Sequence, residues 1–327
     1  MVVRPTRRRF LAGAAASLAL ARPAIVRAAE PLVVCFVPAN SIHWIQDVAI
    51  DKGFYRDVGF EPQVAILQSS PQSIQGAISG AYHIATSQPE PFVAAVEHGA
   101  VNLAAQSAPM NRADWALTGS PSVRSLDDLK GKLIGVSGLR TSEVWLTTQL
   151  LEKNGLKKGE FDFITVGTSP AKITGLNKGS IGAAVLYQPT AELAIKQGLT
   201  LLSRYGALRA YPPILYVVNR DWASRGDAGK RVAQAVRRGH EWLWDPGNRA
   251  EAIGILGRHT KMERKLLDAV YDEYFVNAKI YAKRGEIELA GLDLALADMA
   301  RDGAIIKPPA PPATKYVLAR DMGGLVA

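Results

Sequence analysis

The stretch that decides the fold is GKLIGVSGLRTSEVWLTTQLLEKNG, residues 131–155. Its apolar run at 133–136 is typical of a short buried strand, and a small polar loop follows it. Thr141 and Ser142 are residue types that begin helices, and Gly155 stands where a glycine commonly ends one. Between them apolar residues recur at helical spacing. The stretch therefore predicts a strand, a tight loop and a helix.

The loop of this unit, residues 137–142, could bind a polar or anionic group. The first N–H groups of a helix are free, and the helix dipole favours negative charge there. In open α/β sheets, ligands bind at the carboxyl ends of the strands, where this loop would lie. Arg140 adds a permanent positive charge that could hold a carboxylate, sulfonate or phosphate through two hydrogen bonds. The alternative is an ordinary strand-to-helix connection with a solvated arginine.

The first 29 residues have the composition of an export signal. They hold six arginines and no acidic residue, so the net charge of +9 falls to +3 without them, and a nucleic-acid partner is not indicated. Arg7-Arg8 resembles a twin-arginine motif, an apolar stretch covers 11–21, and alanines at 28 and 29 offer a cleavage point. The apolar stretch is too short for a permanent membrane span. We expect a mature protein in the periplasm.

The same alternation of apolar strands and helices occurs twice, in residues 32–105 and 132–202. This pattern predicts an α/β protein of two lobes, each a mostly parallel sheet flanked by helices. An apolar run at 214–218 is expected to return the chain to the first lobe, before a largely helical remainder. The expected division is a signal peptide at 1–29, a first lobe at 30–113 and 214–327, and a second lobe at 114–213.

The sequence contains none of the common local motifs of enzyme active sites. Cys35 is the single cysteine and falls in the first predicted strand, so no internal disulfide is possible and we expect a buried thiol. The five histidines lack paired metal-ligand spacing, and no phosphate-binding or dinucleotide-binding fingerprint occurs. We predict no metal, no cofactor and no catalytic residue. A secreted enzyme or a ligand sensor on the same fold is the alternative, because a scattered triad leaves no local motif.

Four patches of sequence resemble periplasmic solute-binding proteins of ABC importers, in the nitrate/sulfonate/taurine branch. The patches are Ala49-x-x-Lys52-Gly53-Phe54-Tyr55 with Gly59-Phe60, Ala77-Ile78-Ser79-Gly80 with His83-Ile84-Ala85, Leu126-x-x-Leu129-Lys130-Gly131-Lys132-x-Ile134-Gly135-Val136, and Gly179-Ser180-Ile181-Gly182-Ala183-Ala184. Their order and spacing cover about residues 30–260. The resemblance implies a monomeric, two-lobed type II binding protein with a hinge, which closes on one small-molecule solute and delivers it to a permease in the inner membrane.

The resemblance also places the ligand site at the inner loops that follow the strands. Polar side chains there would supply the hydrogen bonds that a buried solute needs, and three aromatic rings could stack on it. The candidate ligand-binding residues are Asn40, Ser41, His43, Trp44, Ser69, Ser87, Gln88, Ser137, Arg140, Thr141, Thr168, Tyr187 and Gln188. Helix capping is the alternative for the serines and threonines, and core packing for Trp44. We expect an anionic or polar solute such as a sulfonate or a carboxylate, with an aromatic acid preferred.

Overall fold

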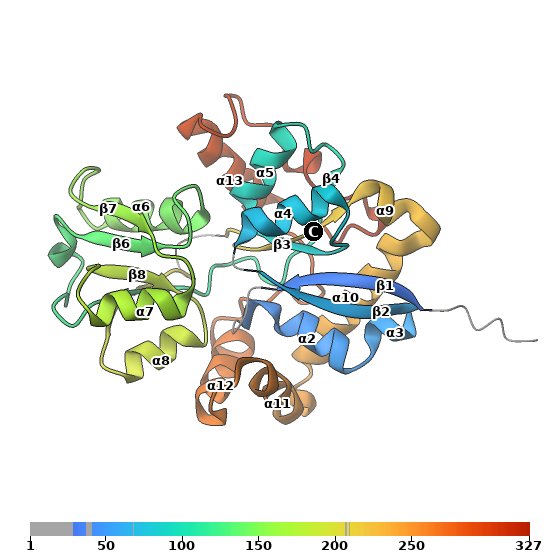
Figure 1. Cartoon of the computed structure of the whole chain (residues 1–327), viewed down its shortest axis with the longest axis horizontal. Helices are drawn as coiled ribbons and strands as arrows, with labels where there is room; N and C mark the ends of the chain where they lie inside the picture. Colours follow the sequence, from blue (N-terminus) through green and yellow to red (C-terminus); the bar gives the residue numbers. More distant parts are fainter. Residues whose placement is uncertain (1–28, 37–40, 68, 207, 209) are drawn as a thin grey trace, which may run out of the picture.

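The computed structural model describes residues 29–36, 41–67, 69–206, 208 and 210–327. The predicted signal peptide and Asn40 lie outside these residues, apart from residue 29. The described chain forms two lobes (Figure 1). The first holds a two-stranded and a three-stranded sheet, which an isolated β-bridge joins into one layer, and the second holds one sheet of five strands. No described helix is both long enough and apolar enough to cross a membrane.

The first lobe contains five strands in the spatial order β2-β1-β3-β10-β4. They are β1 (Glu30–Phe36), β2 (Phe60–Ile66), β3 (Ala85–Ser87), β4 (Leu103–Ser107) and β10 (Leu215–Asn219). Strands β1 and β2 pair in parallel, and a bridge between Val34 and Ile84 joins β1 to the chain just before β3. Strand β10 lies antiparallel between β3 and β4. The apolar run at 214–218 therefore returns to the first sheet, as its sequence indicated.

The second lobe contains five strands in the equivalent order, β7-β6-β8-β5-β9. They are β5 (Ala116–Gly119), β6 (Leu133–Val136), β7 (Asp162–Thr165), β8 (Ala183–Leu186) and β9 (Thr200–Arg204). Strand β6 pairs in parallel with β7 and β8, whereas β5 is antiparallel to β8 and β9. In each sheet the antiparallel strand is the one that follows a crossing from the other lobe. Two connecting segments, 108–115 and 205–214, make these crossings.

Helices cover both sheets (Figure 1). The helices of the first lobe and the C-terminal region are α2 (Trp44–Asp51), α3 (Phe54–Asp57), α4 (Ser70–Ser79), α5 (Pro89–Glu97), α9 (Arg220–Ser224), α10 (Ala228–Trp244), α11 (Arg249–Thr260), α12 (Arg264–Tyr271), the π-helix η5 (Asp272–Asn277) and α13 (Leu289–Asp302). Those of the second lobe are α6 (Ser142–Lys153), α7 (Ser169–Asn177) and α8 (Thr190–Lys196). The short 3-10 helices are η1 (Ser41–His43), η2 (Asp127–Leu129), η3 (Arg225–Asp227), η4 (Pro246–Asn248), η6 (Ala313–Lys315) and η7 (Arg320–Met322).

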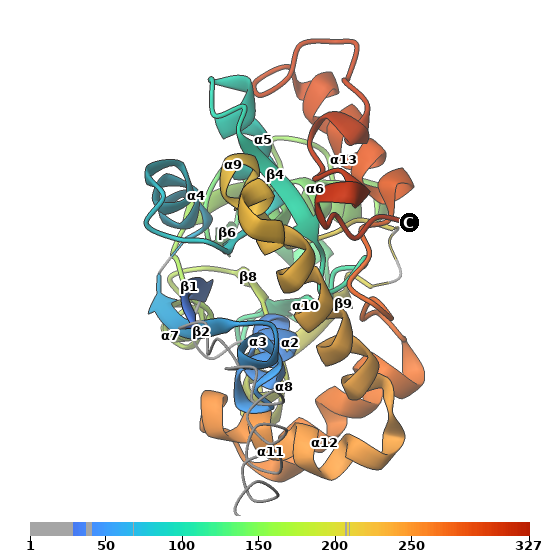
Figure 2. The ribbon, with the colours of Figure 1, turned by 90° about the vertical axis from the view of Figure 1, so that its right-hand side faces the viewer.

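Helix α10 and the C-terminal segment complete the first lobe. Val232, Val236 and Leu243 recur at helical spacing on α10 and are buried, with the helix packed against α2 and α3 (Figure 2). After α13 the chain is extended at Val317, which forms a parallel bridge with Ala105 of β4. Here the chain lies along the edge of the first sheet: the Ala105 N–H donates to the Tyr316 carbonyl, and the Leu318 N–H donates to the Ala105 carbonyl, both at 2.8 Å.

The two lobes share apolar packing where the chain crosses between them. Trp115, Tyr205 and Tyr211 lie on the connecting segments and are each about 1% exposed. They belong to one apolar cluster that also contains Leu103 of the first sheet and Val136 of the second. The apolar core therefore continues from one lobe to the other across the connecting segments.

The unit predicted from 131–155 forms as expected. Strand β6 is followed by a loop at 137–141 and by α6, which is followed by Gly155 at φ +94°, a backbone angle that favours glycine. Thr141 occupies the N-cap position, but its hydroxyl donates to the carbonyl of Gly138 (2.7 Å) instead of accepting from the helix. The loop is closed by Glu143, in the first turn of α6, whose carboxylate accepts two hydrogen bonds from Ser137.

Candidate functional site

The loops that follow the strands bring polar groups of the two lobes into direct contact. The amide N–H and hydroxyl of Ser41 both donate to the carbonyl oxygen of Gln188, at 3.1 and 2.8 Å. The side-chain amide of Gln88 donates to the hydroxyl of Tyr187 at 2.8 Å. In each case one residue belongs to the first lobe and the other to the second. The structure is therefore a closed arrangement, with the strand ends of the two sheets facing one another.

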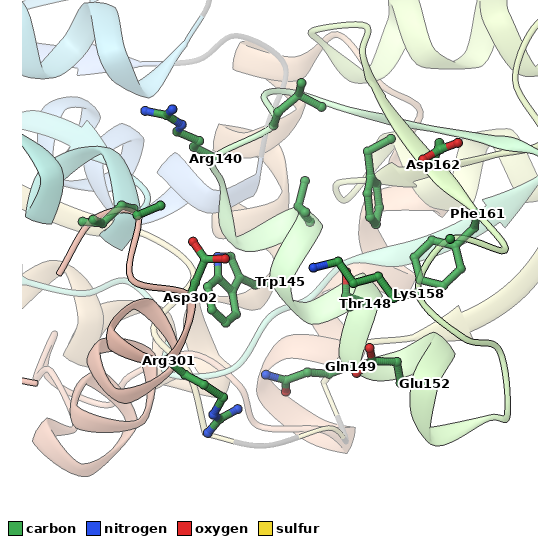
Figure 3. A pocket seen from close by; sticks show the side chains of 16 residues that line it. Arg140, Trp145, Thr148, Gln149, Glu152, Lys158, Phe161, Asp162, Arg301 and Asp302 are labelled. Carbon is green, nitrogen blue, oxygen red and sulfur yellow. The ribbon is translucent and has the colours of Figure 1, made fainter. Parts of the chain in front are cut away.

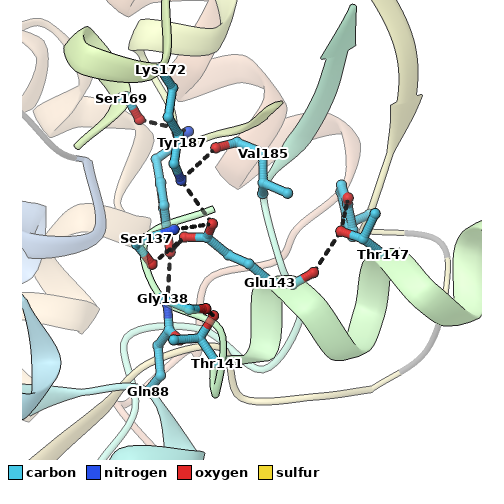
Figure 4. A network of polar contacts seen from close by, with 11 residues as sticks. Gln88, Ser137, Gly138, Thr141, Glu143, Thr147, Ser169, Lys172, Val185 and Tyr187 are labelled. Carbon is cyan, nitrogen blue, oxygen red and sulfur yellow. Dashed lines mark hydrogen bonds and ion pairs between the residues drawn. The ribbon is translucent and has the colours of Figure 1, made fainter. Parts of the chain in front are cut away.

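A buried network around Glu143 supports the second-lobe side of this junction (Figure 4). Its carboxylate accepts from the N–H and hydroxyl of Ser137 at 2.9 and 2.6 Å and from the Tyr187 hydroxyl at 2.6 Å. The Lys172 ammonium lies 2.7 Å from the same carboxylate and donates to the Val185 carbonyl at 2.9 Å. Both charged side chains are fully buried. The network fixes the position of the hydroxyl that Tyr187 presents to Gln88.

Burial controls the protonation of these groups. It lowers the pKa of Lys172, an effect that the neighbouring Glu143 carboxylate opposes. Burial also raises the pKa of Tyr187 well above its ordinary value, and the negative charge of Glu143 raises it further. Tyr187 is therefore a neutral hydroxyl at physiological pH, and it donates to Glu143 while it accepts from Gln88.

A second cross-lobe contact joins α5 to the start of α6. The hydroxyl of Ser142 donates to the Glu90 carboxylate at 2.7 Å, and the hydroxyl of Tyr211 bonds to the other oxygen of that carboxylate. Glu90 is 1% exposed, and burial raises its pKa although the bonds from Tyr211 and Ser142 act against the shift. Farther along α6, Gln149 donates to Asp298 of α13 at 3.1 Å. Polar contacts thus connect the lobes along one side of α6.

A third group leads from the connecting segment to Ser41. Asp114 is buried and accepts a hydrogen bond from the Tyr274 hydroxyl, which lies 2.6 Å from the hydroxyl of Ser41. Ser41 then donates to Gln188 of the second lobe. Burial raises the pKa of Asp114 to about 7. Asp114, a titratable group, is therefore connected through Tyr274 to Ser41, which makes the cross-lobe contact with Gln188.

Five of the candidate residues from the sequence meet at this junction: Ser41, Gln88, Ser137, Tyr187 and Gln188. Gln188 takes part through its main-chain carbonyl. Its side chain turns instead toward α8, where its amide donates to Glu192 at 3.1 Å.

Four candidates serve the local backbone or stand at helix starts. The hydroxyl of Ser87 is buried and donates to the carbonyl of Gln88, and that of Thr141 donates within its own loop. Ser69 and Thr168 occupy the N-cap positions of α4 and α7, where neither side chain makes a capping hydrogen bond. Both are partly buried. The geometry gives Ser87 and Thr141 a structural role in shaping the loops.

The aromatic candidates of the first lobe are placed differently from the prediction. Trp44 is fully buried in the core, and its indole N–H donates to the carbonyl of Ala252 at 2.9 Å, so it does not face the junction. His43 is also buried, with its ring stacked on Phe36 at 4.8 Å between centroids. Burial lowers the pKa of His43 to about 3, so the ring is neutral. The core alternative for Trp44 is the correct one, because the apolar face of α2 turns inward.

Arg140 lies outside the group of buried polar side chains. It is exposed and lines a pocket of about 720 Å³ formed by α6, residues 158–163 and the chain at the end of α13. Figure 3 shows its guanidinium extending away from Trp145 and Asp302, which line the same pocket. The expectation that Arg140 stands beside Ser137 and Thr141 to hold an anion is not supported by this position. An exposed loop residue that precedes the helix remains in water because no buried partner draws it inward.

Several residues of the junction were not anticipated from the sequence, above all Glu143, Lys172, Glu90 and Asp114. A weak signal existed for Lys172, which shares a helical face with the buried Leu176 four residues later. A charged residue on an apolar face indicates a buried partner. Glu143 gave no such signal, because acidic residues are common in the first turn of any helix.

The arrangement is suited to binding through hydrogen bonds. The described residues contain no cluster of three or more His, Cys, Asp or Glu side chains that could hold a metal ion. The groups at the junction are hydroxyls, amides and carboxylates on loops at the strand ends, the usual location of ligand sites in open α/β sheets.

Solved structures share this fold over nearly the whole chain. A ligand-binding component of an ABC-type import system from Staphylococcus aureus, crystallised with zinc bound, is 13% identical with a TM-score of 0.73, covering 90% of this chain and 98% of that one. The alkanesulfonate-binding protein SsuA from Xanthomonas axonopodis pv. citri, bound to MOPS, is 15% identical with a TM-score of 0.71, covering 89% and 99%. The periplasmic nitrate-binding protein NrtA from Synechocystis PCC 6803 is 13% identical with a TM-score of 0.74, covering 90% and 88%. The fold is that of the two-lobed periplasmic binding proteins.

The family follows from the sequence itself. The profile of the NMT1/THI5-like family matches residues 40–249, and the chain belongs to that family. The match confirms the resemblance to the nitrate/sulfonate/taurine branch. No curated protein matches the chain.

Proposed function

We propose that the chain is the extracytoplasmic substrate-binding component of an ABC importer, which closes on a small polar solute and presents it to a membrane permease. The observation that carries the proposal is the set of cross-lobe hydrogen bonds at the strand ends, between Ser41 and Gln188 and between Gln88 and Tyr187. The named functions of the structural neighbours, which include sulfonate and nitrate binding and ABC-type import, support it.

The cross-lobe contacts are of a kind that can form and break reversibly. Each hydrogen bond stabilises a protein by only about 0.5–1.5 kcal/mol net, because water replaces the lost partner. A handful of such bonds can therefore be offset by the binding energy of one solute. We propose that residues 30–113 with 214–327 and residues 114–213 move as two lobes about the connecting segments.

The same proposal includes the location of the protein and its partner in the membrane. Residues 1–29 would direct export by the twin-arginine route to the periplasm, where a monomeric binding protein meets its permease. The protein would bind and release the solute unchanged, without enzymatic turnover. An anionic solute was expected because of Arg140, and the exposure of that side chain weakens this part of the expectation.

The proposal is tested by measuring the distance between the lobes. Gln75 of α4 and Lys178, just after α7, are exposed, and a cysteine at each position would carry a fluorescent label. The native Cys35 is buried, so it does not compete for the label. We expect a solute that binds in calorimetry to change the energy transfer between the labels and to be recovered intact.

Two controls make this experiment specific. A label pair at Lys153 and Lys178, both on the second lobe, should show no change in energy transfer when the solute binds. Arg140→Ala should alter solute affinity by less than about twofold, as for an exposed charge without a buried partner. Binding without any change between the lobes, or conversion of the solute to a product, would contradict the proposed function.

A further inference from the structure

Three buried polar atoms beside the lobe junction have no hydrogen-bond partner among the described residues: Gln88 Oε1, Asp114 Oδ1 and Trp115 Nε1. Their residues are 3%, 8% and 1% exposed. A buried polar group without a partner is costly, so each such atom in a native protein calls for an explanation.

Contacts to Tyr187 and Ser41 bring these residues together. Gln88 donates to the Tyr187 hydroxyl through its amide nitrogen, which leaves its oxygen as the atom without a partner. The rings of Trp115 and Tyr187 meet edge to face at 5.3 Å between centroids. Asp114, next to Trp115 in the chain, is linked to Ser41 through Tyr274. All three atoms therefore border the place where the lobes touch.

A cavity of about 480 Å³ adjoins this region, and Asp114 and Trp115 line it together with Arg112, Arg204 and Glu273. Its size falls within the range of roughly 300–1,000 Å³ typical of small-molecule sites. The cavity lies between the two connecting segments and residues 273–280. Its walls thus include the segments about which the lobes are proposed to move.

The three atoms define a chemical class. A carboxylate oxygen and an amide oxygen accept hydrogen bonds, whereas an indole N–H can only donate. A sulfonate or nitrate offers acceptor oxygens alone, so its lone pairs would face those of Gln88 Oε1 and, where Asp114 is ionised, those of Asp114 Oδ1. The buried cation at the junction, Lys172, is already bound to Glu143. Arg204 of the cavity is bound to Glu192 at 2.6 Å, and Arg112 is partly exposed.

We propose that the solute carries N–H or O–H groups that donate hydrogen bonds to Asp114 Oδ1 and Gln88 Oε1. It also carries an acceptor atom for the Trp115 indole N–H. An amide, or an amidine-type group beside an oxygen or a ring nitrogen, provides both kinds of group. This inference rests on the proposed function and specifies the chemical class of the solute. It assigns Asp114 and Trp115, which the sequence did not suggest, to the binding site. It replaces the aromatic acid that was expected from Arg140 together with the rings of His43, Trp44 and Tyr187.

The experiment measures binding of near-isosteric pairs to the mature chain by calorimetry, together with the energy transfer between lobes. The pairs are benzamide and benzoate, nicotinamide and nicotinate, and taurine and ethanesulfonate. We expect the member with N–H groups to bind at least tenfold more tightly in every pair that binds. Tighter binding of the acids with closure of the lobes would overturn this inference and leave the proposed function standing. Binding of no compound at all would overturn both.

Variants assign the contacts. Asp114→Asn removes the negative charge and replaces one of the two acceptor oxygens by an N–H₂ donor. Trp115→Phe removes the indole donor, so each variant should weaken binding of the best amide by about tenfold. Asp47→Asn is the matched control, since Asp47 is also a buried aspartate whose Oδ1 has no hydrogen-bond partner among the described residues, but it does not line the cavity. Melting curves verify that each variant is folded. Unchanged affinity in folded Asp114→Asn would overturn the assignment.

Discussion

Replacement of Lys172 by methionine tests whether the buried ion pair supports the junction. In Lys172→Met the Glu143 carboxylate keeps its bonds from Ser137 and Tyr187 but loses the ammonium 2.7 Å away. Both side chains are 0% exposed, so no water can take the place of the lost charge. Removal of one partner of a buried pair typically costs roughly 3–5 kcal/mol. For roughly 300 residues, with an unfolding entropy of roughly 2.1 cal/mol/K per residue, that corresponds to a fall in melting temperature of roughly 5–8 °C.

The free energy of unfolding is measured by urea denaturation, in a double-mutant cycle with Glu143→Gln. The doubly substituted protein has no buried charge left, so we expect it to recover most of the loss. Lys153→Met, on the exposed face of α6, is the control and should change stability by less than about 0.5 kcal/mol. A loss below about 1 kcal/mol in Lys172→Met, or a double variant no more stable than the single one, would refute the reasoning.

Three further predictions concern the junction and the single thiol. Tyr187→Phe removes the hydroxyl between Gln88 and Glu143, so the solute affinity measured by calorimetry should fall about tenfold. An unchanged affinity would contradict a role of this hydroxyl in closing the lobes. Burial raises the pKa of Asp114 from 3.8 to about 7, so the folded state binds more protons than the unfolded state between these values, and stability falls as pH rises from about 4 to about 7. Melting temperatures across this range should decline less steeply in Asp114→Asn, and parallel curves would exclude this origin. Burial raises the pKa of Cys35 to about 12, so a maleimide at pH 7 should label the unfolded chain only. Labelling of the folded protein at the same rate would contradict this prediction.

Local patterns predicted most of the secondary structure. Helix α6 begins after Thr141 and is followed by Gly155, because capping residues and a glycine at positive φ act through neighbouring backbone groups. The repeated strand-and-helix pattern likewise predicted two sheets. It did not predict that β5 and β10 are antiparallel and inserted into their sheets, because strand direction depends on pairing between distant segments.

The loops that carry the candidate site were predictable from the sequence, whereas the burial and the hydrogen-bond partners of their polar side chains were not. Polar residues at strand ends were expected to meet, and Gln88 of the first lobe does contact Tyr187 of the second, 99 residues later. Local pattern could not decide whether Arg140 or Glu143, three residues apart in the same unit, would be the buried charge. The structure leaves the first in water and buries the second against Lys172.

Sequence pattern was sufficient to establish the α/β class, the doubled strand-and-helix pattern, the family and the loops on which a site would lie. These properties follow from apolar periodicity, glycines and capping residues, which act within a few positions along the chain. The tertiary structure alone decided which polar groups are buried, and with which partners. Asp114 meets Tyr274 across 160 residues and Glu143 meets Lys172 across 29, and such pairs arise only when packing removes water from both groups at once.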